Sequence, residues 1–183
     1  MTPSHWLRRW TPPSPGHALD LACGSGRNLR WLAAQGWQVC GVDRDSAATA
    51  PLRGLAEIID ADIENGPWPL ADRQFDLVVV CNYLWRPLIT QIRDAVAPGG
   101  WLIWETFADG HQRLGRPSRP DFLLQRGELL RALGDWQIAA YEDLEEGGVN
   151  PRVVQRVAAI RPRPGEQAQA PLLKSSDSQD IPS

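Results

Sequence analysis

The sequence predicts an α/β fold with a mostly parallel seven-stranded sheet that ends in a C-terminal antiparallel hairpin. Short apolar segments alternate with segments of helical periodicity along residues 17–160, the pattern of right-handed βαβ units around a parallel sheet. A glycine-rich turn joins the first strand to the first helix, where such sheets bind ligands. The last two strand segments are close enough in sequence to pair with each other.

The first half of the chain gives the clearer elements. Residues 17–22 (HALDLA) are typical of a buried strand, and residues 28–35 of a helix with Leu29, Leu32 and Ala33 on one face. Gly36 stands where a helix commonly ends. Strands follow at 38–42 and 57–60, separated by a weak helix at 47–55 that Pro51 interrupts.

The second half begins with residues 75–81 (FDLVVVC), apolar enough for a central strand of a parallel sheet. A helix is expected at 84–97, closed by Pro98-Gly99-Gly100. The remaining predicted elements are a strand at 101–105, a short helix at 127–133, and two strands at 137–143 and 153–160.

Length and composition indicate one folded domain. The chain has 183 residues, of which 43% are hydrophobic and 22% charged, as in ordinary globular proteins. We expect an entry arm rich in Pro and Trp at residues 1–15 and a domain at 16–161. Residues 162–183 are rich in Pro, Gln, Ser and Asp, which predicts a disordered tail.

The net charge and the cysteine content indicate which binding partners and which cellular compartment to expect. The net charge of −3 argues against DNA and indiscriminate nucleic-acid binding. The three cysteines, Cys23, Cys40 and Cys81, lack metal-ligand spacing, so we expect buried reduced thiols and no metal. No apolar run is long enough to cross a membrane, and the N-terminus lacks a signal-peptide core. We therefore expect a cytoplasmic protein.

Residues 20–28 (DLACGSGRN) contain the glycine turn. Gly24 and Gly26 permit a tight turn and a close approach of ligand to backbone. The third glycine of a dinucleotide fingerprint is replaced by Leu29, and no P-loop is present. If this motif is considered alone, a turn with a purely structural role explains it equally well.

Two acids follow the next two strands. Asp43 ends the second strand, where a carboxylate can accept hydrogen bonds from both ribose hydroxyls of an adenosine. Asp62 follows the third strand and could accept from an adenine amino group, with Ile63 packing on the ring. Each could separately be a helix cap or loop acid, but their order and spacing are far more specific.

With these motifs in order, residues 17–160 resemble the class I S-adenosylmethionine-dependent methyltransferases. DLACGSGRN is similar to their first motif, GVD to their second-strand acid, DAD to their adenine-side acid, and APGGWL to the turn before their fifth strand. The nearest resemblance is to small bacterial methyltransferases of the tellurite-resistance type. It implies a Rossmann-like fold and S-adenosyl-L-methionine as cofactor.

The resemblance also implies roles for single residues. The implied cofactor contacts are Asp20, Ala22, Gly24 and Gly26 at the methionine side, with Asn28 orienting the motif, Asp43 and Arg44 near the ribose, Asp62 and Ile63 at the adenine, and Cys81 near the sulfonium. Asn82, Tyr83 and Glu105 follow the fourth strand or end the fifth, and we expect them at the catalytic centre.

The acceptor is expected to be a small, anionic or soft nucleophile. Methyl transfer is an in-line displacement that depends mainly on positioning and desolvation, and a general base is needed only for a protonated, hard acceptor. The predicted substrate contacts are Trp85, Arg86, Arg116 and Arg119, the last two in a long loop at 107–124 that could form a lid. Core packing or a solvated loop would explain the same residues.

Other functions stay open at this stage. The acceptor could be RNA or protein, because arginines gather between residues 113 and 126. The chain could also be a nucleotide-cofactor-binding module without transferase activity. A nicotinamide-dependent oxidoreductase is disfavoured by the missing third glycine and by the absence of a Tyr-x-x-x-Lys pair.

Overall fold

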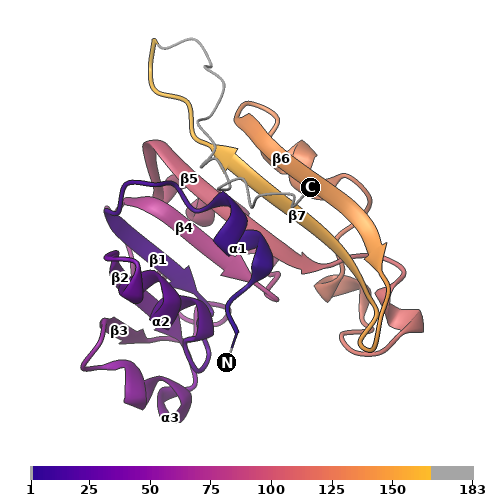
Figure 1. Ribbon diagram of the computed structural model, residues 1–183, viewed down its shortest axis with the longest axis horizontal. Coiled ribbons are helices and arrows are strands. Elements are labelled where there is room, and N and C mark those ends of the chain that lie inside the picture. The colour runs from indigo at the N-terminus through magenta and orange to yellow at the C-terminus, as the bar shows by residue number, and fades with distance from the viewer. Residues whose placement is uncertain (1, 166–183) are drawn as a thin grey trace, which may run out of the picture.

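A seven-stranded sheet forms the centre of the protein, in the order β3-β2-β1-β4-β5-β7-β6 (Figure 1). The computed structural model describes residues 2–165. The strands are β1 His17–Leu21, β2 Gln38–Asp43, β3 Glu57–Asp60, β4 Phe75–Cys81, β5 Val96–Phe107, β6 Gln137–Glu146 and β7 Arg152–Ile160. The first five are parallel, and β7 runs antiparallel between β5 and β6. The predicted fold class is confirmed.

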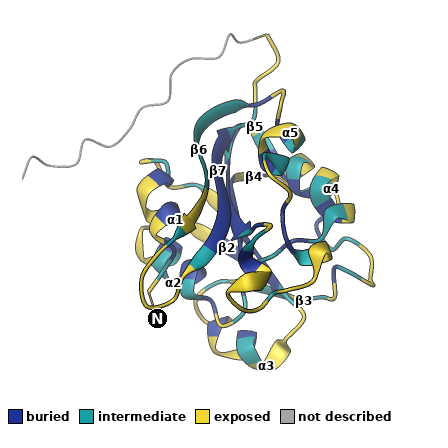
Figure 2. Ribbon diagram, turned by 90° about the vertical axis from the view of Figure 1, so that its right-hand side faces the viewer, coloured by how far each residue is buried: buried dark blue, intermediate teal, exposed yellow. Residues whose placement is uncertain are grey.

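Helices cover both faces of this sheet, with α1 and α2 on one side and α4 and α5 on the other (Figure 2). The α-helices are α1 His5–Trp10, α2 Arg27–Ala34, α3 Ser46–Thr49, α4 Ile89–Asp94 and α5 Glu128–Ala132. Short 3₁₀ turns occur at Ala50–Leu52, Arg86–Leu88, His111–Arg113 and Pro120–Phe122. The result is a three-layer α/β arrangement with one apolar core on each face of the sheet.

Strand β4 occupies the centre because its side chains are apolar on both faces. Val78 and Val80 belong to the core beneath α4 and α5, and Leu77 and Val79 to the core beneath α1 and α2. All four side chains are fully buried. The strand pairs with β1 on one side and β5 on the other, so its backbone groups are also satisfied.

The segment predicted as an entry arm contains a helix that the sequence reasoning missed. The Ser4 side chain accepts a hydrogen bond from the backbone N–H of Leu7 and caps α1. Trp6, Leu7 and Trp10 are buried against the sheet. Ser4 before a run of apolar residues was the available signal.

Two element boundaries also differ from prediction. The helix expected at 84–97 is shorter, since a 3₁₀ turn containing Pro87 precedes α4. Residues 96–100, predicted to end the helix and turn, belong to β5. They join the strand although Gly99 is left-handed (φ 81°), because Gly99 donates to the carbonyl of Arg161 and Arg161 donates to that of Gly100.

The predictions of a disordered tail and of a cytoplasmic location are not tested by the structure. Of the predicted tail, residues 162–165 are described, and 166–183 lie outside the described residues. Within the described part of the chain, none of the helices is long and apolar enough to span a membrane. The cytoplasmic location stays a prediction.

Candidate cofactor site

A pocket of about 190 Å³ lies at the carboxyl ends of β1 to β4. The strand order reverses between β1 and β4, which is where open α/β sheets form their ligand crevice. The lining residues come from four separate segments: Ala22, Asp43, Arg44, Ala61, Asp62, Ile63, Glu64 and Tyr83. Five of the predicted cofactor contacts, Ala22, Asp43, Arg44, Asp62 and Ile63, are therefore brought together.

The glycine turn takes a left-handed backbone conformation at three positions, Ala22 (φ 53°), Gly24 (φ 53°) and Gly26 (φ 77°). A Cβ on Gly26 would lie 2.6 Å from the Leu52 side chain, whereas one on Gly24 would meet no atom of the described residues within 4 Å. Gly26 is thus required for packing. Gly24 leaves free space on the open side of the turn, as close approach of a ligand requires.

Asp43 ties this turn to the end of β2. Its Oδ2 accepts a hydrogen bond from the backbone N–H of Gly24 at 2.7 Å, and its Oδ1 accepts one from Asp45 at 2.9 Å. Each carboxylate oxygen can accept a second hydrogen bond. The carboxylate lines the pocket, so it is both a scaffold group and an acceptor suited to ribose hydroxyls.

Asp62 and Ile63 form the opposite end of the pocket. Asp62 is exposed, and its carboxylate accepts from the backbone N–H of Glu64 and from the Asn65 backbone and side chain. The Asn65 side-chain hydrogen bond contributes most to holding the pKa of Asp62 below its usual range. Ile63 is only 8% exposed. An ionised acceptor beside an apolar side chain suits an adenine ring and its amino group.

Tyr83, predicted at the catalytic centre, lines this same pocket with Asp62, Ile63 and Glu64. Its hydroxyl is buried and has no hydrogen-bond partner among residues 2–165. Burial, followed by the nearby Glu64 charge, raises the pKa of this phenol. The structure therefore places a neutral donor beside Asp62 and Ile63, and a direct role for Tyr83 in transfer stays a prediction.

The predicted sulfonium end lies where β1 and β4 finish. Asp20 is 1% exposed and accepts a hydrogen bond from the backbone N–H of Leu29 at 3.0 Å. Burial raises the pKa of Asp20 to about 7, and burial also keeps the pKa of the Cys81 thiol well above its usual value. Asn82 is exposed, has φ 55°, and donates its backbone N–H to the carbonyl of Glu105.

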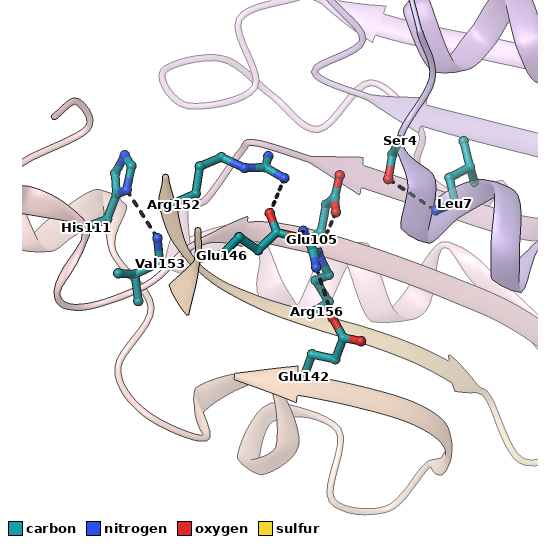
Figure 3. Close-up of polar contacts among 9 residues, drawn as sticks. All are labelled: Ser4, Leu7, Glu105, His111, Glu142, Glu146, Arg152, Val153 and Arg156. Carbon is teal, nitrogen blue, oxygen red and sulfur yellow. Dashed lines mark hydrogen bonds and ion pairs between the residues drawn. The ribbon is translucent and has the colours of Figure 1, made fainter. Parts of the chain in front are cut away.

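Glu105, the third predicted catalytic residue, is held in a ladder of charges across three strands (Figure 3). Its Oε2 accepts a hydrogen bond from Arg156 Nε at 2.9 Å. Arg156 also binds Glu142 at 2.9 Å and Glu146 at 2.6 Å, and Arg152 binds Glu146. Since Glu105 is 4% exposed and paired, its carboxylate is poorly placed to remove a proton from an acceptor.

The predicted acceptor contacts are only partly available. The Arg86 guanidinium binds the Glu128 carboxylate and the carbonyls of Asp121 and Leu123. An acceptor contact would require these bonds to break. Trp85 packs against the hydrophobic core. Both predicted roles stay predictions, and the structure gives each side chain a structural contact.

Several contacts hold the loop at 107–124 in a folded conformation. Ala108 and Leu124 form a parallel bridge, and the buried His111 ring stacks on Phe107 with centroids 4.4 Å apart. Arg119 pairs with Asp121. Arg116 is exposed. These contacts favour a folded platform over a long mobile lid.

Some site residues were absent from the sequence-based set. Ala61 and Glu64 line the pocket, and both neighbour predicted contacts in sequence, so extending that motif by one residue on each side would have found them. Asn28, predicted to orient the motif, is buried and accepts from the backbone N–H of Ser4 at 2.9 Å. It thus links the glycine turn to α1. Among residues 2–165, no group of three or more His, Cys, Asp or Glu side chains could hold a metal.

Comparison with known proteins agrees with this geometry. A family model described as a methyltransferase domain matches residues 18–100, which span the glycine turn, both acids and β4. Over this segment the chain is similar to methyltransferase domains, and its fold matches that of the class I S-adenosylmethionine-dependent methyltransferases. The fold and the pocket residues fit S-adenosylmethionine, and the predicted resemblance is confirmed over the matched segment.

One relative of known name is a ribosomal RNA methyltransferase. Ribosomal RNA small subunit methyltransferase C of Alcanivorax borkumensis is 51% identical over an alignment 108 residues long, which covers 49% of this chain and 32% of that protein. The chain thus spans about a third of that relative's length.

Two solved structures share the fold. TehB from Haemophilus influenzae matches with a TM-score of 0.67 and 20% identity over 81% of this chain and 58% of its own. The glycopeptide N-methyltransferase MtfA, complexed with S-adenosyl-L-methionine, matches with a TM-score of 0.59 and 19% identity over 83% of this chain and 90% of its own.

The two turn glycines give a matched pair of variants. Gly24→Ala should cost about 1–2 kcal/mol of stability, from the left-handed backbone alone, yet abolish most S-adenosylhomocysteine binding by filling the open side of the turn. Gly26→Ala should destabilise more, because its Cβ also collides with Leu52. Urea unfolding and calorimetry measure the two effects. Tight ligand binding by folded Gly24→Ala would contradict this assignment.

Asp20 should make stability depend on pH. Its pKa is about 7 in the folded protein and near 3.8 when exposed, so the folded state binds more protons between these values. Stability contributed by Asp20 is therefore full below about pH 4 and is lost as the pH rises through about 7. Each pKa unit corresponds to about 1.4 kcal/mol.

The variant Asp20→Asn removes this dependence while keeping an acceptor for Leu29. Its melting temperature should exceed that of the wild type by several degrees at about pH 8 and by much less at about pH 5. The exposed Asp72→Asn substitution is the control. An equal difference at both pH values would show that Asp20 is ionised throughout.

Proposed function

We propose that this enzyme transfers the methyl group of S-adenosylmethionine to a small, anionic or soft nucleophile. The observation that carries the proposal is the meeting of the glycine turn, Asp43, and the Asp62–Ile63 pair around one pocket at the β1/β4 switch point. When bound there, the cofactor supplies a sulfonium methyl group already activated for in-line displacement. The protein's own residues have to bind, orient and exclude water.

Each part of the pocket suits one part of the cofactor. Asp62 would accept from the adenine amino group, and Ile63 would pack against the ring. Asp43 would accept from the ribose hydroxyls while it keeps its bond to Gly24. Tyr83, a half-buried neutral phenol whose hydroxyl is buried, would donate to a heteroatom at the adenine end or complete its packing. These roles use hydrogen bonds that are preformed in the fold.

The burial and pairing of Glu105, Asp20 and Cys81 favour an acceptor that needs no general base to remove a proton. Glu105 is buried against Arg156, and Asp20 lies beneath the turn with one oxygen on Leu29. The Cys81 thiol is buried, and its raised pKa keeps it protonated. With no evident general base among these groups, a thiolate, chalcogen anion or other anionic nucleophile is the acceptor class best served.

Arginines in the 107–124 loop supply positive charge that would match an anionic acceptor. Arg116 is exposed, and Arg119 is exposed, with an ion pair to Asp121 and its guanidinium over the Phe122 ring. Exposed salt bridges are worth about 0–1 kcal/mol, so Arg119 can exchange this partner for an anionic ligand. A guanidinium fork then binds and orients the acceptor.

A second candidate acceptor is RNA. The match to ribosomal RNA small subunit methyltransferase C favours it, and Arg113, Arg116, Arg119 and Arg126 would then contact phosphates. Since only 32% of that protein is matched, its acceptor specificity is open for this chain. The net charge of −3 favours the small acceptor.

The cofactor assignment is tested by calorimetric titration with S-adenosylhomocysteine, using NAD as the control. The wild type should bind S-adenosylhomocysteine alone. Asp43→Ala should weaken binding at least about tenfold, equivalent to about 1.4 kcal/mol, because the ribose loses its acceptor. Binding of NAD, or of neither compound, would refute the proposal and favour a module with another ligand or none.

The acceptor class is tested with a labelled methyl donor. Small thiols, chalcogen oxyanions and carboxylates are compared with ribosomal RNA. The double variant Arg116→Ala/Arg119→Ala should raise the acceptor KM without changing affinity for S-adenosylhomocysteine, and the exposed Arg8→Ala serves as the control. Unchanged acceptor kinetics would remove these arginines from the acceptor site, and labelling of RNA alone would establish the second candidate.

A further inference from the structure

His111 is a polar side chain buried near the start of the 107–124 platform. It begins the 3₁₀ turn His111–Arg113 and is 4% exposed. Its ring stacks on Phe107, the last residue of β5, with ring centroids 4.4 Å apart. A phenylalanine ring could stack in the same way without bringing polar atoms that need partners. The use of an imidazole at this position is therefore explained by its two nitrogen atoms.

Each ring nitrogen of His111 has a backbone partner. The N–H of Val153, in β7, donates to Nδ1 at 3.4 Å (Figure 3). Because Nδ1 accepts, the proton of the neutral ring is on Nε2, and Nε2 donates to the carbonyl of Arg116 at 3.1 Å. One buried side chain thus joins the sheet to a residue whose guanidinium binds the acceptor in the proposed function.

Arg116 lies between two attachments of the platform. On one side, the backbone N–H groups of residues 114–115 donate to the His111 carbonyl. On the other side, Arg86 binds carbonyls within residues 121–123. The Arg116 side chain is exposed, but its backbone is held at the carbonyl that His111 binds. Holding the backbone in place reduces the entropy that is lost when the guanidinium binds an anion.

We propose that His111 is a positioning residue for the methyl acceptor. Its Nε2 holds the Arg116 backbone so that the Arg116 guanidinium meets an anionic group of the acceptor. This inference rests on the proposed function and deepens it, since His111 acts through Arg116 and is not itself an acceptor contact. A purely structural role would require only that Nδ1 accepts from Val153. The two roles can be separated because they use different ring nitrogens.

Two amide side chains each replace one of these nitrogens. In His111→Gln, the amide nitrogen stands as far along the side chain as Nε2 and can donate to the Arg116 carbonyl. In His111→Asn, the amide oxygen takes the place of Nδ1 and can accept from Val153, but the shorter side chain has no donor at the position of Nε2. Both variants lose the stacked ring, so the difference between them reports the link to Arg116.

The probes are two small thiols, 3-mercaptopropionate with a carboxylate and 2-mercaptoethanol with a hydroxyl. In the assay with a labelled methyl donor, the thiolate sulfur bonds to the methyl carbon as the donor's sulfur–methyl bond breaks, and S-adenosylhomocysteine is released. The wild type should have the lower KM for the anionic thiol. Arg116→Ala should raise that KM about threefold to tenfold, as expected for one lost hydrogen bond, and leave the KM for 2-mercaptoethanol unchanged.

His111→Asn should reproduce the effect of Arg116→Ala on both KM values, whereas His111→Gln should stay near the wild type. The double variant His111→Asn/Arg116→Ala should match Arg116→Ala alone, because both changes remove one interaction. The affinity for S-adenosylhomocysteine, measured by calorimetry, should be the same in all of these variants. His17→Asn, an exposed position at the start of β1, is the control and should change neither KM.

Three results would overturn the inference. Equal KM changes for the two thiols, or equal losses in His111→Gln and His111→Asn, would show that His111 serves the fold alone, while the small-acceptor function stands. A wild type with no preference for the anionic thiol would remove Arg116, and with it His111, from acceptor recognition. A wild type that binds S-adenosylhomocysteine but methylates neither thiol would overturn the proposed acceptor class together with this inference.

Discussion

The reversal of strand order between β1 and β4 is the constraint on which the site depends. The chain leaves β1 toward β2 on one side and returns in β4 on the other, so the connections diverge and leave a crevice at the strand ends. Central β4 must be apolar on both faces to lie there, and all its residues except Asp76 are buried. The polar groups that follow β1, β2, β3 and β4 then meet around one pocket.

Preformed hydrogen bonds hold this pocket in shape. The bond from Gly24 to Asp43 joins the turn to β2, and the bond from Leu29 to Asp20 joins the start of α2 to β1. Asn28 extends the connection to α1 through Ser4. These groups are positioned by the fold, so ligand binding need not order them, which lowers its entropic cost.

On the other side of the switch point, Glu105, predicted at the catalytic centre, and Arg86, predicted to contact the acceptor, are bound within the protein. Arg156 joins β5 to β6 through Glu105 and Glu142, and Arg86 joins its segment to α5 through Glu128. Breaking a buried pair by removing one partner is strongly destabilising. Arg86 also fastens the 107–124 platform through the carbonyls of Asp121 and Leu123, and Arg116 and Arg119 are exposed on this platform.

The sequence by itself determined the order of elements, the parallel sheet with its antiparallel end, the glycine turn, and the acids Asp43 and Asp62, because strand periodicity and turn chemistry are local properties. Tertiary structure alone decided which charged groups have partners. Glu105, more than 50 residues from Arg156 in the chain, is paired only because β5 lies beside β7. Likewise, Tyr83 lies beside Asp62 and Ile63 in the pocket through packing between segments that are distant in the chain, which no local pattern encodes.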